Sequence, residues 1–82
     1  MRTKRINPTP EQLTERERAA IRFIQAYTTA HRKSPSTEEV QAAIGLSLSA
    51  THGLLQRLLA WGYLAKRWRR ATHRNLRVVR EI

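Results

Sequence analysis

The fold is decided by residues 46–62, which read Leu46-Ser-Leu-Ser-Ala-Thr-His-Gly-Leu-Leu-Gln-Arg-Leu-Leu-Ala-Trp-Gly62. A hydroxyl residue before an apolar-periodic run and a glycine after it are typical start and stop signals of a helix. We therefore expect a helix over residues 49–61 with Ser49 as its N-cap. At 100° per residue, this helix has one apolar face and one small, polar face. The apolar face carries Leu48, Thr51, Leu55, Leu58 and Leu59, and the polar face carries Ser49, Ala50, Gly53, Gln56, Arg57 and Ala60.

The polar face of this helix has no acidic residue. A solvated helix face usually mixes both signs of charge, whereas a small face without carboxylates suits close approach to a polyanion. The rest of the chain has a matching charge distribution. Its 82 residues carry a formal net charge of +10, and from Val40 to Arg80 there are eight basic side chains and no carboxylate. This asymmetry predicts a nucleic-acid partner.

Length and composition limit the other possibilities. An 82-residue chain is expected to form one small domain, and without cysteine it has neither a disulfide nor a zinc–thiolate site. No pattern of a signal peptide or a membrane span is present, so we expect a cytoplasmic, nucleoid-associated protein. We predict a flexible basic arm over residues 1–12 and the folded domain over residues 13–82.

Two capping boxes predict two further helices. In each, the side chains of a hydroxyl residue and of a glutamate three positions later satisfy each other's free backbone N–H. The pairs are Thr14 with Glu17 and Ser36 with Glu39. The second helix is short and should end at Gly45. The expected core positions of the two helices are Leu13, Ala20, Ile21, Ile24, Tyr27, Val40 and Ile44.

A short helix, a turn with glycine and a helix with a polar face together indicate a helix-turn-helix. The segments 63–68 and 75–79 have the aromatic and alternating character of strands, and the basic segment 69–74 joins them. Two strands around a basic loop form a β-hairpin, or wing. The predicted fold class is therefore mostly α with a small β-hairpin: a winged helix-turn-helix of three helices plus a wing sheet of two or three strands.

Six motifs occur in one order along the chain. They are Leu13-Thr14-x-Arg16, Phe23-Ile24, Pro35-Ser36-x-x-Glu39-Val40, Gly45-Leu46, Thr51-His52-Gly53-x-Leu55-x-Arg57-Leu58 and Gly62-Tyr63-Leu64. With these motifs, residues 13–79 resemble the N-terminal DNA-binding domain of LexA-type repressors. The resemblance implies a transcriptional repressor that places helix 49–61 in the major groove of double-stranded DNA and the loop 69–74 on the backbone. It implies no enzyme activity here, since self-cleavage in that family belongs to a separate C-terminal serine–lysine protease domain. The chain is then a stand-alone relative or an excised domain.

The predicted DNA-binding residues are Ser36, Ser47, Ser49, Ala50, His52, Gly53, Gln56, Arg57, Arg69, Arg70 and Arg74. The Gln56 amide can pair bidentately with adenine, and arginine can bind guanine or a phosphate. Because Arg57 lies a second turn along the helix, we expect it to contact a phosphate rather than a base. His52 is either a DNA contact or a partly buried histidine bonded to the backbone. Gly53 lowers helix propensity by about 1 kcal/mol relative to alanine, which either close approach to DNA or tight packing would explain.

Leu54, Leu58 and Trp61 lie at helical spacing along one flank of the helix. They form either core covered by Tyr63 or an exposed stripe for a homodimer. If that stripe is exposed, a protein-interaction adaptor is an alternative function, and a binder of RNA or of replication structures is another. His31, His52 and His73 do not form a metal pattern, and no catalytic constellation stands out, so we expect no cofactor, metal or enzyme activity.

Overall fold

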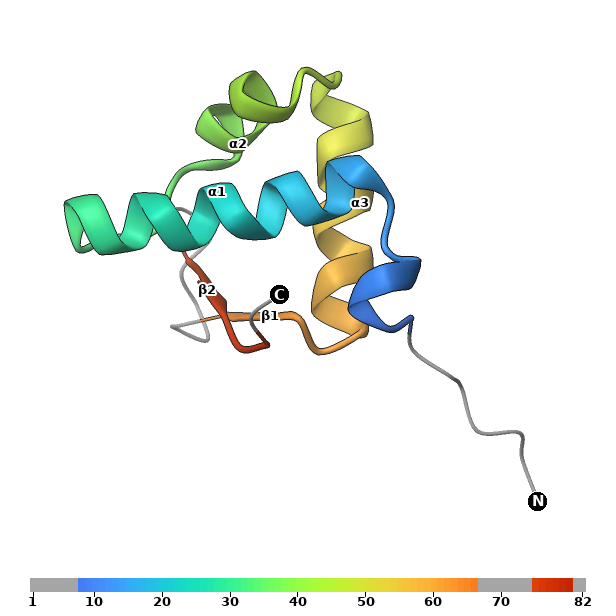
Figure 1. Cartoon of the computed structure of the whole chain (residues 1–82). Helices are drawn as coiled ribbons and strands as arrows, with labels where there is room; N and C mark the ends of the chain where they lie inside the picture. The colour runs from blue at the N-terminus through green and yellow to red at the C-terminus, as the bar shows by residue number, and fades with distance from the viewer. Residues whose placement is uncertain (1–7, 67–74, 81–82) are drawn as a thin grey trace.

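In a computed structural model of the chain, residues 8–66 and 75–80 are described, and they form a winged helix-turn-helix. The elements are the 3-10 helix η1 (Pro10–Gln12), α1 (Glu15–His31), α2 (Thr37–Ile44), α3 (Leu48–Ala60), β1 (Leu64–Lys66) and β2 (Leu76–Val78). Figure 1 shows α1 across the middle of the molecule, with α2 on one side of it and the two strands on the other. Helix α3 runs from α2 to β1 and crosses α1 on the way. The predicted fold class is confirmed.

Both predicted capping boxes are present. The amide of Glu17 donates to the Thr14 hydroxyl at 3.1 Å, and the amide of Thr14 donates to the Glu17 carboxylate at 2.8 Å. The same exchange between Ser36 and Glu39 opens α2, with distances of 3.1 and 2.7 Å. Gly45 ends α2 with a φ of 72°, a left-handed conformation that glycine adopts without steric cost.

The start of α3 differs from the prediction. Its N-cap is Ser47 and not Ser49, because the Ser47 hydroxyl accepts from the amide of Ala50 at 3.1 Å. The hydroxyl of Thr51 donates to the Ser47 carbonyl at 2.8 Å and adds a second bond to this turn. Either serine suits a cap, so the choice depends on the preceding turn. There Leu46 packs against the core directly after Gly45, and the next residue takes the cap position.

Buried apolar side chains from all three helices and both strands form one core. Its members are Leu13, Ala20, Ile21, Ile24, Val40, Ile44, Leu54, Leu55, Leu58, Tyr63, Leu64 and Leu76. One prediction about the faces of α3 is wrong: Leu48, expected on the core side, is 43% exposed, because it begins the helix while Leu46 packs against the core. Of the two alternatives for Leu54, Leu58 and Trp61, the core is confirmed for the two leucines. They are 2% and 0% exposed and so cannot form an exposed dimer stripe, and Trp61 is half-buried against the same core.

The two strands pair antiparallel in the register Leu64↔Val78, Ala65↔Arg77 and Lys66↔Leu76. Leu76 is buried and Arg77 is exposed, as the alternation predicted. The buried Ser34 hydroxyl donates to the Leu76 carbonyl, which ties the α1–α2 connection to the wing. The predicted wing contacts at 69–74 lie outside the described residues.

Tyr63 joins the two ends of the described chain to α3. Its ring is fully buried, and its hydroxyl donates to the Pro8 carbonyl at 2.5 Å. Its carbonyl accepts from the amide of Val79 at 2.9 Å, and the Arg80 guanidinium lies 4.8 Å from its ring centroid. Residues 8–12 thus contact the folded part, and the division at residue 12 stays a prediction. No helix in the described ranges is long and apolar enough to cross a membrane.

Two leucines of α3 allow a matched test of this packing. Leu55→Ala removes a side chain that is 4% exposed, and we expect a loss of roughly 2–5 kcal/mol in the free energy of unfolding. Leu48→Ala removes an exposed side chain of the same type, and we expect a change within about 0.5 kcal/mol. Urea unfolding followed by helix circular dichroism measures both. Equal losses in the two variants would contradict this assignment of helix faces.

Candidate nucleic-acid interface

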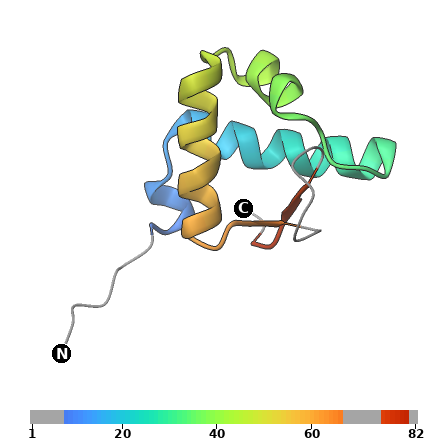
Figure 2. The same cartoon turned by 180° about the vertical axis from the view of Figure 1, so that it is seen from behind.

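The outer face of α3 is uncovered. Seen from behind, α3 lies in front of the other described helices and strands (Figure 2). Its predicted polar face is confirmed in position, because Ser49, Ala50, Gln56, Arg57 and Ala60 are exposed and Gly53 is half-buried. The buried residues Thr51, Leu54, Leu55 and Leu58 hold the opposite side on the core. The fold therefore presents a helix face that is small in its first turns and carries no acidic side chain.

The first turn of this face combines hydroxyl and apolar groups. Ser47 and Ser49 are exposed, and the exposed Leu48 lies between them. Leu48 is not among the predicted site residues, because a cap at Ser49 would leave Leu48 before the helix. A cap at Ser47, four residues before Thr51, is the local pattern that fits a helix beginning at Leu48. An exposed apolar side chain at the start of a groove-binding helix suits the methyl group of thymine.

Gly53 is not required by packing. A Cβ atom built on it would meet the Nη1 atom of Arg57 at 3.8 Å, an ordinary van der Waals contact with the end of a flexible side chain. Gly53 also lies inside α3 with no positive φ. Of the two explanations for this glycine, tight packing is therefore wrong. Close approach of DNA to the helix backbone at Gly53 stays a prediction.

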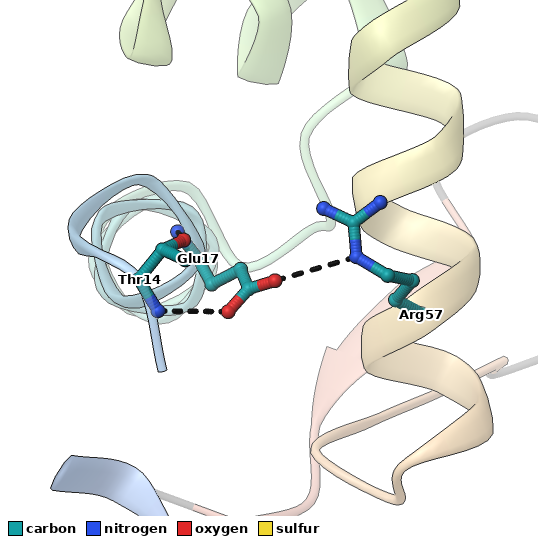
Figure 3. Close-up of polar contacts among 3 residues, drawn as sticks. All are labelled: Thr14, Glu17 and Arg57. Carbon is teal, nitrogen blue, oxygen red and sulfur yellow. Dashed lines mark hydrogen bonds and ion pairs between the residues drawn. The ribbon is translucent and has the colours of Figure 1, made fainter. Parts of the chain in front are cut away.

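Arg57 is tied to α1. Its Nε atom donates to the Oε2 atom of Glu17 at 3.3 Å, as Figure 3 shows. The Glu17 side chain is 6% exposed, whereas the Arg57 side chain is 51% exposed. From the sequence, Glu17 was predicted only as part of the helix cap. No local signal links the two residues, because they are 40 positions apart in the chain.

Gln56 lies at a groove between α3 and the wing. The groove is lined by Gln56 and Lys66 together with Thr37, Leu55 and Asn75 among others. Lys66 is exposed at the end of β1, so a cation and an amide share this groove. Neither group is acidic, so the groove suits a nucleic-acid backbone that runs between the helix and the wing.

The remaining predicted site residues have different surroundings. His52 is exposed, so the alternative of a partly buried histidine is wrong. Ser36 is buried and its hydroxyl caps α2, away from the outer face of α3, so its DNA contact stays a prediction. Arg69, Arg70 and Arg74 are outside the described residues. Within residues 8–66 and 75–80, no group of His, Asp and Glu is arranged to hold a metal ion.

Two comparisons with known proteins agree with this geometry. The IclR helix-turn-helix domain matches residues 27–67, which run from the last part of α1 to the end of β1. The LexA repressor of Limosilactobacillus fermentum (strain NBRC 3956 / LMG 18251) is 38% identical over 58 residues. That alignment covers 70% of this chain and 28% of the repressor. The comparisons confirm the predicted resemblance to the helix-turn-helix DNA-binding domain of the LexA type.

Gly53→Ala separates the stability of α3 from its function. Alanine has the higher helix propensity, so we expect the free energy of unfolding to rise by about 1 kcal/mol. We expect DNA affinity to fall, because the new methyl group stands on the face that approaches the ligand. Thermal unfolding and binding titrations with a duplex measure the two effects.

Gly45→Ala is the control variant for both measurements. At a φ of 72° alanine is strained, so this variant should lose roughly 1–2 kcal/mol of stability. A Gly53→Ala variant that is both less stable and unchanged in DNA affinity would show that the glycine serves the fold.

Proposed function

Because the chain belongs to the IclR helix-turn-helix domain family, we propose that it is a transcriptional repressor that binds double-stranded DNA with α3 in the major groove. One observation carries this proposal. The uncovered face of α3 presents Ser49, Ala50, Gln56 and Arg57 with no carboxylate among them, in a chain whose formal net charge is +10. A major groove admits one helix, and phosphates flank it on both sides.

In this proposal base reading and backbone binding involve different residues. Gln56 has the donor and the acceptor that pair bidentately with adenine, and the first turn meets base edges through the hydroxyls of Ser47 and Ser49 and the apolar side chain of Leu48. Arg57 and the wing cations Arg69, Arg70 and Arg74 bind phosphates, which adds affinity without sequence information. Because the contacting face is small, we expect modest specificity and a large backbone share of the affinity.

The relatives also support the setting of this function. The matched family is a helix-turn-helix domain, and the matched relative is named a repressor, so we propose a role in regulation rather than in catalysis. The alignment covers little more than a quarter of that repressor, so its other activities are not carried over. A DNA-binding regulator of this type works at the bacterial nucleoid, in the cytoplasm.

The alternative of a protein-interaction adaptor has less support. An exposed patch of Leu54 and Trp61 would favour it, but Leu54 is 2% exposed in the core and Trp61 is half-buried. Selection from a pool of random duplexes at one stated salt concentration tests the DNA proposal directly. Recovery of a common sequence supports it. Failure to retain any duplex, with retention of structured RNA instead, would contradict it.

Gln56→Ala tests whether α3 reads sequence. We expect the preference at one base position to relax by about 1–3 kcal/mol, while affinity for a scrambled duplex stays nearly unchanged. Arg57→Ala is the comparison, because loss of a phosphate contact weakens both duplexes alike. Binding curves for the selected and scrambled duplexes at the same salt concentration give all four values. Equal losses on both duplexes for Gln56→Ala would mean that this residue reads no base.

Replacing Arg69, Arg70 and Arg74 together by alanine tests the wing. If the domain neutralises about six phosphates, the slope of log K against log salt concentration is near −5, at about 0.9 per phosphate. The triple variant should weaken binding to all sequences and flatten the slope by up to about 3. Arg22→Ala, at an exposed position of α1, is the control for the loss of one positive charge outside the wing. An unchanged slope in the triple variant would remove the wing from the interface.

A further inference from the structure

The carboxylate of Glu17 is fixed on both of its oxygens. Oε1 accepts from the backbone amide of Thr14 at 2.8 Å, and Oε2 accepts from Nε of Arg57 at 3.3 Å. The side chain is 6% exposed, so the packing around it leaves few other rotamers. Figure 3 shows this arrangement, with the carboxylate pointing from the first turn of α1 toward α3. The helix cap therefore acts as a rigid anchor for an arginine of another helix.

Only the Nε atom of Arg57 is held by this anchor. In Figure 3 the dashed line from Glu17 ends on Nε, and no dashed line reaches the two terminal nitrogens of Arg57. Within residues 8–66 and 75–80, these terminal nitrogens have no hydrogen-bond partner. The guanidinium is therefore oriented while its two terminal nitrogens are free to donate to a ligand.

Arg57 lines a groove between α1 and α3. The groove is lined by Thr14 and Arg16 from the start of α1, and by Ala50, Gly53 and Arg57 from the outer face of α3, among others. Arg16 is exposed and brings a second positive charge to the opposite wall. Two guanidinium groups across a groove with small side chains fit one phosphate group, which accepts several N–H donors at once.

We propose that Glu17 is a positioning residue that holds Arg57 so that its free nitrogens, together with Arg16, bind one phosphate of the DNA backbone in this groove. The inference rests on the proposed DNA-binding function and assigns one contact of that site. An arginine oriented before binding loses less side-chain freedom when it meets its ligand than a mobile one does. The anchor also explains how a carboxylate is tolerated beside a DNA-binding face, because it lies buried behind the cation.

For Glu17→Gln, the positioning role predicts weaker DNA binding, whereas the change in net charge alone predicts stronger DNA binding. Glu17→Gln removes a negative charge near the phosphate, so charge alone would strengthen DNA binding. Glutamine also serves at the third position of a capping box, so its amide oxygen still accepts from Thr14. The amide nitrogen of the substituted side chain would then face the Nε–H of Arg57. Both groups are donors, so the hydrogen bond that tethers position 57 to position 17 is lost. We therefore expect binding to weaken by roughly three- to tenfold.

The experiment measures Kd for the parent chain, Glu17→Gln and Glu15→Gln on one duplex at one salt concentration. Glu15 is exposed in the first turn of the same helix, so its substitution makes the same change in charge without touching the tether. We expect Glu15→Gln to bind as tightly as the parent or slightly more tightly. Glu17→Gln binding as tightly as Glu15→Gln would overturn the inference while the proposed function stands. Absence of duplex binding by the parent would instead overturn the proposed function.

Two further variants exclude a general effect on folding. In an Arg57→Ala background, Glu17→Gln should cause no additional loss of affinity; the same loss in both backgrounds would overturn the inference. Arg57→Lys keeps the charge and leaves the Thr14–Glu17 cap intact, but lysine has no Nε–H to be tethered beside free terminal nitrogens. We expect this variant to bind more weakly than the parent on the same duplex, and equal affinity would also overturn the inference. Urea unfolding of each variant identifies any that is not folded.

Discussion

Each capping-box glutamate uses one carboxylate oxygen to start its own helix and the other oxygen to hold a second helix. Glu17 accepts from the Thr14 amide and from Arg57 of α3, and Glu39 accepts from the Ser36 amide and from the Tyr27 hydroxyl of α1 at 3.1 Å. The helix cap holds the glutamate side chain in one orientation at the start of its own helix. The second hydrogen bond then fixes a residue of the neighbouring helix relative to that side chain. The placement of α1 against α2 and α3 therefore depends on two short sequence motifs as well as on the core.

The small size of the domain makes these polar links important. A single core of few large side chains supplies limited stability, so local caps and turns contribute a substantial share. Gly53, on the outer face of α3, lowers the stability of the helix relative to alanine, and neither packing nor backbone conformation requires glycine there. A residue that is unfavourable for the fold and harmless to replace sterically is typical of a functional surface.

Tyr63 has a corresponding role at the other end of α3. Its buried ring and its hydroxyl bond to the Pro8 carbonyl bring the segment before α1 to the end of α3, and its carbonyl accepts from the amides of Val79 and Arg80 after β2. The start of β1 and the end of β2 are thus held at the C-terminal end of α3. This geometry places Lys66 at the end of β1 beside Gln56, so the helix and the wing line one groove.

The features that could be predicted from the sequence are those whose signals lie within about four residues. Both capping boxes, the stop at Gly45, the polar face of α3 and the alternation in β2 were predicted correctly, because backbone hydrogen bonding and side-chain periodicity are local properties. The burial of residues at the border between two helix faces depended on how the elements pack. Periodicity leaves the rotation of a helix uncertain, so the burial of Leu54 and the exposure of Leu48 depended on where α2 and Leu46 lie. The Glu17–Arg57 and Tyr63–Pro8 contacts join residues 40 and 55 positions apart, and no local pattern carries information over that distance.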